Sequence, residues 1–219
     1  MFNSHGYDIK YFRCDKYGAC IDSLEEIKPD IILINPNFTV NSNITMPVTR
    51  RLEIIKWAKE NNVLIIEDDY NGELRYSTHP MPCVQNYDTE NTVYLGSFSK
   101  ILLPSVRISY MVLPPHLAAT YQEKLDFYAC TVSNFEQYAL AAFIEEGYFE
   151  KHLNRMRLYY TKQREAVLSV LKEEPFKCVG RVREADSGLH FILELNTLLS
   201  DNEVKRKLEA DGILSLIHI

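Results

Sequence analysis

Short apolar segments alternate with helix-like segments along most of this sequence, and that alternation limits the chain to a few folds. The expected strands are rich in β-branched and large apolar residues and are separated by turn-forming residues. They are Ile9–Phe12, Ile31–Ile34, Val63–Ile66, Thr92–Leu95 and Ile108–Leu113. Strand, helix and strand at this spacing are typical of a parallel sheet with helices packed on its faces. The sequence therefore predicts an α/β fold whose sheet is mostly parallel and flanked by helices.

One helix is expected between the second and third of these strands. Pro47 suits the first turn of a helix, and Asn61–Asn62 are residues that commonly end one. Leu52, Ile55 and Ala58 recur at helical spacing between these limits. We therefore expect these three side chains to form the stripe that packs on the sheet.

The second half of the chain changes to longer helices. The range 134–172 contains almost no Gly or Pro, with Gly147 as the exception. Its apolar residues recur at three- and four-residue steps or their sum, which predicts one long amphipathic face: Ile144, Tyr148, Leu153, Met156, Tyr160 and Val167. After Pro175 the chain returns to short strands such as Phe191–Leu195, so a smaller α/β unit is expected there.

Charge and cysteine content narrow the class of partner. The formal net charge is −6, and charges of both signs are mixed along the chain, which disfavours direct binding of nucleic acid. The 5 cysteines are odd in number and show no CxxC spacing, so we expect reduced thiols in a cytoplasmic protein. No apolar run approaches the roughly 20 residues that a membrane-spanning helix needs. A small molecule or another protein is the expected partner.

Three segments carry residues that suggest chemistry. The segment Ile65–Tyr70 runs from an apolar strand into acidic residues and a tyrosine, and Tyr94–Lys100 runs from a strand into hydroxyls and a lysine. Arg107 follows shortly after. In an open α/β sheet, ligands bind beyond the carboxyl ends of the strands. Asp68 and Lys100 fall at such ends, so they should lie close together if their strands are neighbours.

These residue types fit a cofactor that has an aldehyde, a pyridine ring and a phosphate. A lysine amine adds to an aldehyde, and a carboxylate keeps a ring nitrogen protonated. A tyrosine hydroxyl can bond a phenolic oxygen, while small hydroxyls and an arginine satisfy a phosphate. Each residue also has a simpler explanation, as a helix cap, a solvated charge or half of a surface ion pair. The residues alone leave both explanations open.

Longer motifs in the same segments resemble a known family. Ser97–Lys100 with Arg107 resembles the lysine–arginine signature of fold-type I, class I/II aminotransferases. Four stretches resemble, more narrowly, the aminotransferase-like domain of MocR-type regulators of the GntR family: Glu67–Tyr76, Leu95–Pro114, Glu146–Arg157 and Ser187–His190. The resemblance extends from about Phe2 to Ile213. It implies a pyridoxal 5′-phosphate (PLP) binding, effector-sensing domain of a transcription regulator. The alternative is part of a free-standing class I aminotransferase acting on amino acids and keto acids.

The resemblance also implies roles for the residues that would contact the ring of PLP. Lys100 would be the Schiff-base lysine and therefore the catalytic residue. Asp68 would pair with the pyridine nitrogen, and Tyr70 would contact the phenolic oxygen. Asp69 is the rival for the role of Asp68, which we favour because the family places the first aspartate of the pair against the ring.

The phosphate contacts follow from the same resemblance. Ser97 and Arg107 would hold the phosphate, and Ser99, beside Lys100, is a further candidate contact. No metal is expected. The sequence departs from the family's Pro-x-Gly turn within Asn35–Pro47, where Asn43 is expected to take the positive-φ position. Which residue of this segment touches the cofactor ring is left open.

The resemblance implies an incomplete set of domains. We expect residues 1–150 to be the C-terminal part of the PLP-binding large domain, and 151–213 to be a long helix with a truncated small domain. Residues 214–219 are expected to be non-native, because the family continues with a proline-containing turn; a native apolar strand is the alternative. The phosphate cup, the ring-stacking aromatic and a winged-helix domain are expected before Met1, and the arginine that binds the substrate carboxylate after Ile219.

The expected partners follow from this organisation. The ligand would be an amino acid or an amine, acting as effector or substrate. The full-length parent would be a homodimer, and DNA would be bound only through the winged-helix domain. No membrane contact is expected. The chain by itself is not expected to turn over a substrate.

Overall fold

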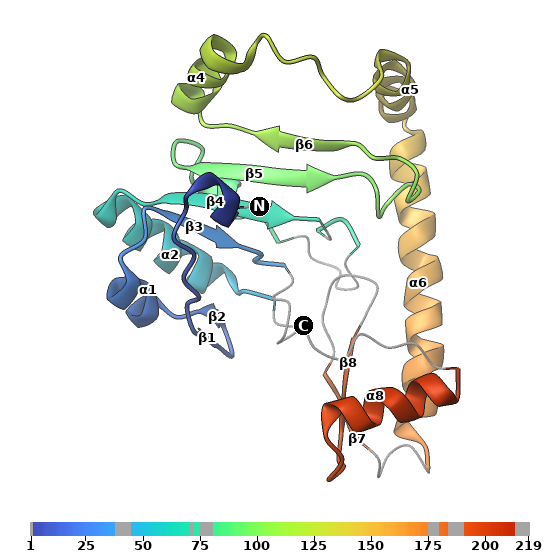
Figure 1. Cartoon of the computed structure of the whole chain (residues 1–219). Helices are drawn as coiled ribbons and strands as arrows, with labels where there is room; N and C mark the ends of the chain where they lie inside the picture. Colours follow the sequence, from blue (N-terminus) through green and yellow to red (C-terminus); the bar gives the residue numbers. More distant parts are fainter. Residues whose placement is uncertain are drawn as a thin grey trace.

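The computed structural model describes residues 2–37, 45–70, 72–74, 81–174, 180–183 and 191–212. Its largest sheet has four strands, and Figure 1 shows helices beside this sheet and a long helix leading to a smaller C-terminal unit. The elements are η1 (Phe2–His5), β1 (Cys14–Asp15), β2 (Gly18–Ala19), α1 (Ile21–Ile27), β3 (Ile31–Ile34), α2 (Val48–Asn61), β4 (Leu64–Asp69), α3 (Val84–Tyr87), β5 (Thr92–Ser97), β6 (Ser109–Val112), α4 (Pro115–Leu125), α5 (Asn134–Glu145), α6 (Tyr148–Lys172), β7 (Gly180–Arg183), β8 (Ile192–Leu195) and α8 (Asp201–Ala210).

The central sheet has the strand order β3-β4-β5-β6. The first three strands are parallel, and β6 runs antiparallel to β5. The expectation of a mostly parallel sheet is therefore confirmed, and its four strands lie at the positions that the apolar segments indicate. Two strands continue beyond their apolar part, β4 as far as Asp69 and β5 as far as Ser97, because these polar residues still pair with the neighbouring strand.

The predicted first strand, Ile9–Phe12, is wrong. Residues 7–13 have no regular secondary structure, and a two-residue hairpin strand begins only at Cys14. An alternating apolar pattern makes a strand only where a neighbour takes up its backbone hydrogen bonds, and no described strand pairs with this segment. Tyr11 is 92% exposed, while Phe12 packs partly against the core.

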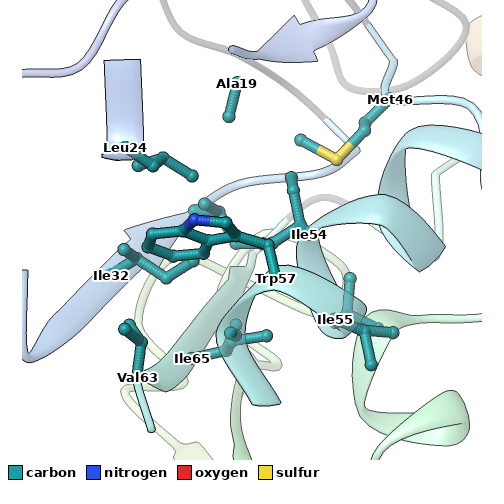
Figure 2. Close-up of a cluster of buried hydrophobic side chains, with 12 residues drawn as sticks. Ala19, Leu24, Ile32, Met46, Ile54, Ile55, Trp57, Val63 and Ile65 are labelled. Carbon is teal, nitrogen blue, oxygen red and sulfur yellow. The ribbon is translucent and has the colours of Figure 1, made fainter. Parts of the chain in front are cut away.

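The main core lies between α2 and one face of the sheet. In Figure 2, Trp57 of α2 lies beside Leu24 of α1 and Ile32 of β3, in the same cluster as Ile54 and Ile65. The helix begins after Pro47 and ends at Asn61, and Asn62 caps it with a left-handed φ of 55°. Both ends therefore confirm the prediction.

The buried stripe of α2 includes Ile55 and Ala58, as predicted, but not Leu52. Leu52 is 45% exposed, and the buried residues include Arg51, Ile54, Ile55 and Ala58. Those four follow the spacing i, i+3, i+4, i+7 of a core-facing helix. Because an arginine occupies the first position, a pattern built from apolar residues alone selects Leu52 instead.

The two faces of the sheet differ in how they are covered. Along β4, Ile65, Glu67 and Asp69 are buried on the face that α2 and α3 cover. The alternate residues Ile66 and Asp68 point to the opposite face, since successive side chains of a strand alternate. On that second face, the side chains of Ile31 and Leu33 in β3 are exposed in the described structure.

The predicted long amphipathic face is divided into two helices. Gly147, with φ of 74°, separates α5 from α6. Within α6, Leu153 and Leu168 are the buried residues, whereas Tyr148 and Val167 are exposed. Figure 1 shows α6 running from the end of the sheet down to β7, β8 and α8. The long helix itself is confirmed, but its predicted apolar face is not buried throughout.

The C-terminal elements form a hairpin and a helix. The strands β7 and β8 pair antiparallel, which confirms a strand near Phe191–Leu195. Ser200 and Glu203 form a capping box at the start of α8. The domain division at residue 150 stays a prediction, and Asn43, Cys178 and residues 214–219 lie outside the described residues. The four described cysteines are free thiols, and no helix among the described residues is long and apolar enough to cross a membrane.

Candidate functional site

The sheet brings together the residues that follow β4 and β5. These strands are parallel neighbours, and Asp68 pairs in register with Leu95. Their carboxyl ends therefore meet at one edge, as the sequence predicts. The Nζ of Lys100 lies 4.1 Å from the centroid of the Tyr70 ring. Asp68 and Lys100 are close enough for each charge to change the pKa of the other.

The electrostatics of this pair favour a reactive amine. Burial lowers the pKa of Lys100 below its ordinary value, and the Asp68 carboxylate opposes that shift. The side chain as a whole is exposed, but its amine lies over the Tyr70 ring and is partly desolvated. Burial raises the pKa of Asp68, the charge of Asp69 raises it further, and Lys100 lowers it. A lysine with a lowered pKa has a larger neutral fraction, which is the nucleophilic form.

Asp69 lies on the other face of the sheet and has different partners. Its side chain is 5% exposed, and the Tyr94 hydroxyl donates to its Oδ2 at 3.1 Å. Gly72 approaches so closely that a β-carbon there would overlap the same oxygen. Burial and the charge of Asp69 raise the pKa of Tyr94. Of the two aspartates, Asp68 is the one that faces Lys100.

The loop that carries Lys100 is closed by hydrogen bonds between its two ends. The Phe98 amide donates to the Ile108 carbonyl at 3.0 Å, and the Ser99 hydroxyl donates to the Val106 carbonyl at 2.6 Å. The Ile101 amide donates to the Phe98 carbonyl at 3.1 Å. These bonds fix the backbone on both sides of Lys100. The loop therefore sets the place from which the Lys100 side chain extends.

A small group of hydroxyls surrounds the end of β5. The Ser97 Oγ accepts hydrogen bonds from the Ser99 amide at 3.3 Å and from the Ser109 hydroxyl at 3.4 Å. The side chain of Arg107 is exposed, and no hydrogen bond or ion pair joins it to another described residue. The sequence analysis does not identify Ser109 as a member of this group. The signal that could have found it is the antiparallel pairing of Ser97 with Ser109 across the loop.

We expect the two aspartates to affect Lys100 differently. Asp68→Asn removes the carboxylate that raises the pKa of Lys100, so that pKa should fall further below the ordinary value. Asp69→Asn should change it little, because Asp69 faces Tyr94. The pH dependence of Lys100 labelling by an amine reagent, followed by peptide mass spectrometry without added cofactor, measures both. A larger shift in Asp69→Asn than in Asp68→Asn would contradict the arrangement.

Comparison with known proteins agrees with this geometry. The sequence model of the family "Aminotransferase class I and II" matches residues 2–211. The chain is 39% identical over 214 residues to the HTH-type transcriptional regulator YdeL of Bacillus subtilis (strain 168), covering 97% of this chain and 46% of that protein. It is 30% identical over 200 residues to the probable rhizopine catabolism regulatory protein MocR of Rhizobium meliloti, covering 91% and 40%.

Solved structures show the same fold. The kynurenine aminotransferase of Pyrococcus horikoshii, solved in complex with PMP, superposes with a TM-score of 0.76 at 27% identity, covering 92% of this chain and 52% of that one. The fold is that of the fold-type I aminotransferases. The chain belongs to the aminotransferase class I and II family. It spans less than half the length of the two regulators that it matches.

Proposed function

We propose that this chain is the PLP-binding, aminotransferase-like part of a MocR-type transcription regulator, and that it senses an amino acid or an amine. One observation carries the proposal. Lys100, Asp68 and Tyr70 converge at the carboxyl ends of two adjacent parallel strands, in an arrangement that suits a pyridine-ring aldehyde. The similarity to YdeL and MocR supports the regulator over an independent enzyme.

Lys100, Asp68 and Tyr70 would each contact a different part of PLP. When bound, PLP supplies an aldehyde that bonds covalently to an amine, and a protonated ring that withdraws electrons. Lys100 provides the amine, and its lowered pKa favours the neutral, nucleophilic form. Asp68 is partly buried, which raises the pKa of its carboxyl group. A positively charged ring nitrogen beside it would keep the carboxylate ionised. Tyr70 offers its hydroxyl to the phenolic oxygen.

The serine hydroxyls at the end of β5, together with Arg107, would hold the phosphate. Ser97 and Ser109 supply hydroxyls, and Arg107 supplies an exposed guanidinium whose planar fork matches two phosphate oxygens. The hydroxyl of Ser99 already donates to Val106 and closes the loop. A direct contact between Ser99 and the cofactor stays a prediction.

Covalent trapping in the full-length protein tests the proposal. PLP is titrated into the apoprotein and its visible absorption is followed. The complex is then reduced with borohydride and digested, and the modified peptide is identified by mass spectrometry. We expect one modified lysine, at Lys100. Modification at a different lysine, or absence of a reducible complex at saturating PLP, would overturn it.

The runner-up is a free-standing aminotransferase that transfers amino groups between amino acids and keto acids. The structural similarity to the kynurenine aminotransferase favours it. The two functions separate when the PLP-loaded full-length protein is mixed with a panel of amino acids and amines. A regulator should change its affinity for DNA with little release of keto acid, whereas an enzyme should release keto acid over many turnovers.

We also propose that the full-length protein is a homodimer that binds DNA through a separate winged-helix domain. Support for the dimer comes from α4, α5 and their connection, where exposed aromatic residues gather: Tyr121, Phe127, Tyr128, Phe135 and Tyr138. An exposed apolar patch of this kind commonly marks a protein contact. Sedimentation of the full-length protein measures its mass in solution, and a monomer at all concentrations would contradict this part of the proposal.

A further inference from the structure

Two successive turns of α6 contact both segments that carry the candidate site. The Nε2 of His152 lies 2.9 Å from the carbonyl oxygen of Ile101, the residue after Lys100. The Nε of Arg157 donates to the carbonyl oxygen of Glu73 at 2.8 Å, shortly after Tyr70. The two contacts join residues that are 51 and 84 positions apart in the sequence. A single helix therefore holds the backbone beyond β4 and the backbone beyond β5.

Apolar packing reinforces the two polar contacts. Leu153 of α6 forms a buried cluster with Leu74 and Ile101, one residue from each of the two segments. Phe149, one turn earlier, meets the ring of Phe98 edge to face with centroids 5.8 Å apart. The backbone groups that His152 and Arg157 bind thus lie beside a well-packed contact, where a small shift of the helix would be resisted.

The hydrogen-bonding role of His152 is fixed by its other ring nitrogen. Its Nδ1 lies 3.3 Å from Nη2 of Arg155. A guanidinium can only donate, so Nδ1 accepts and the ring proton lies on Nε2. That proton points at the Ile101 carbonyl. The ring of Phe143 meets the histidine ring edge to face, with centroids 6.3 Å apart.

We propose that His152 and Arg157 are positioning residues that set Lys100 relative to Tyr70. Lys100 and Tyr70 belong to different loops, yet the amine lies 4.1 Å from the ring centroid. Both loops are held by α6, at Ile101 and at Glu73, within a few residues of the two side chains. A misplacement of about 1 Å at a reacting group can cost on the order of a hundredfold in rate. The inference rests on the proposed function, in which Lys100 bonds the cofactor.

The test compares three variants in the full-length protein. His152→Leu removes the donor, and we expect its Kd for PLP to rise about tenfold, with slower covalent attachment to Lys100. His152→Gln places an amide donor near the position of Nε2, and its Kd should return to within about threefold of the wild type. Leu168→Ala is the control, because Leu168 is buried in the same helix far from the site. It should lower the Tm and leave the Kd unchanged.

A second readout separates this inference from the proposed function. The midpoint pH for labelling of Lys100, measured without PLP, should move towards that of an ordinary lysine in His152→Leu but not in His152→Gln. If the wild type fails to bind PLP but this shift occurs, the proposed function fails and the positioning role stands. If neither the Kd nor the midpoint changes in His152→Leu, or if Leu168→Ala changes them equally, the inference is overturned.

Discussion

Replacing Lys100 with alanine is expected to abolish covalent attachment of PLP to the full-length protein. The amine of Lys100 is partly desolvated and faces Asp68 and Tyr70, so no other described lysine occupies an equivalent position. The borohydride-stable mass increase should fall to background. Cofactor held by Asp68, Ser97 and Arg107 alone should be weaker by about tenfold or more, or at least 1.4 kcal/mol. Intact-protein mass spectrometry and equilibrium dialysis measure the two effects.

Lys100→Arg is the matched control for charge. A guanidinium keeps the positive charge beside Asp68 and over the Tyr70 ring, but it stays protonated and forms no bond to the aldehyde. The free energy of unfolding of both variants should lie within about 1 kcal/mol of the wild-type value, because the lysine side chain is exposed. A Lys100→Ala protein that retains the reducible adduct at the wild-type level would show that another amine holds the cofactor.

The meeting of Asp68 and Lys100 in the candidate site could be predicted from the sequence because it depends on strand ends. Apolar runs mark the strands, and the polar residues that follow must meet where parallel strands end together. The choice between Asp68 and Asp69 could not be made this way. Adjacent residues of a strand point to opposite faces, and which face is covered depends on where α2 packs. Only the fold shows that Asp69 faces Tyr94 while Asp68 faces Lys100.

The features that could not be predicted depend on backbone groups distant in the sequence. His152 and Arg157 act on the carbonyls of Ile101 and Glu73, and every residue has a carbonyl, so no residue pattern reveals such a pairing. The failure at Ile9–Phe12 has a related cause, because a strand needs a neighbour whose presence the segment itself does not encode.

Arg51 is expected to be among the most sensitive positions of the chain for stability. Its side chain is 0% exposed, and its guanidinium donates four hydrogen bonds to residues in the described part of the chain. The acceptors are the carbonyls of Met46 at 3.0 Å, Pro82 at 2.8 Å and Pro36 at 3.3 Å, with the Asn37 side-chain oxygen at 2.7 Å. One cation thus joins the connection between β3 and α2 to Pro82, which lies shortly before α3.

Arg51→Met keeps an unbranched apolar side chain as far as the position of Nε but removes every donor. Buried acceptors that lose their partners cost about 1–3 kcal/mol each before relaxation, so we expect a loss of about 3–5 kcal/mol in the free energy of unfolding. Leu52→Ala is the control, since Leu52 is apolar but exposed, and it should cost about 1 kcal/mol or less. Urea unfolding measures both. Equal losses in the two variants would mean that Arg51 is not the core position.

The pH dependence of the Arg51→Met loss identifies its electrostatic part. Glu67 is fully buried and accepts from the Val84 and Gln85 amides. Burial raises its pKa above the ordinary 4.5, and the Arg51 charge acts to lower it. Without Arg51 that pKa should rise further, so the folded state keeps a proton that the unfolded state releases. Folding is then disfavoured as pH rises above 4.5. The loss in Arg51→Met should therefore be larger at neutral pH than near 4.5, and a loss independent of pH would leave only the broken hydrogen bonds as its cause.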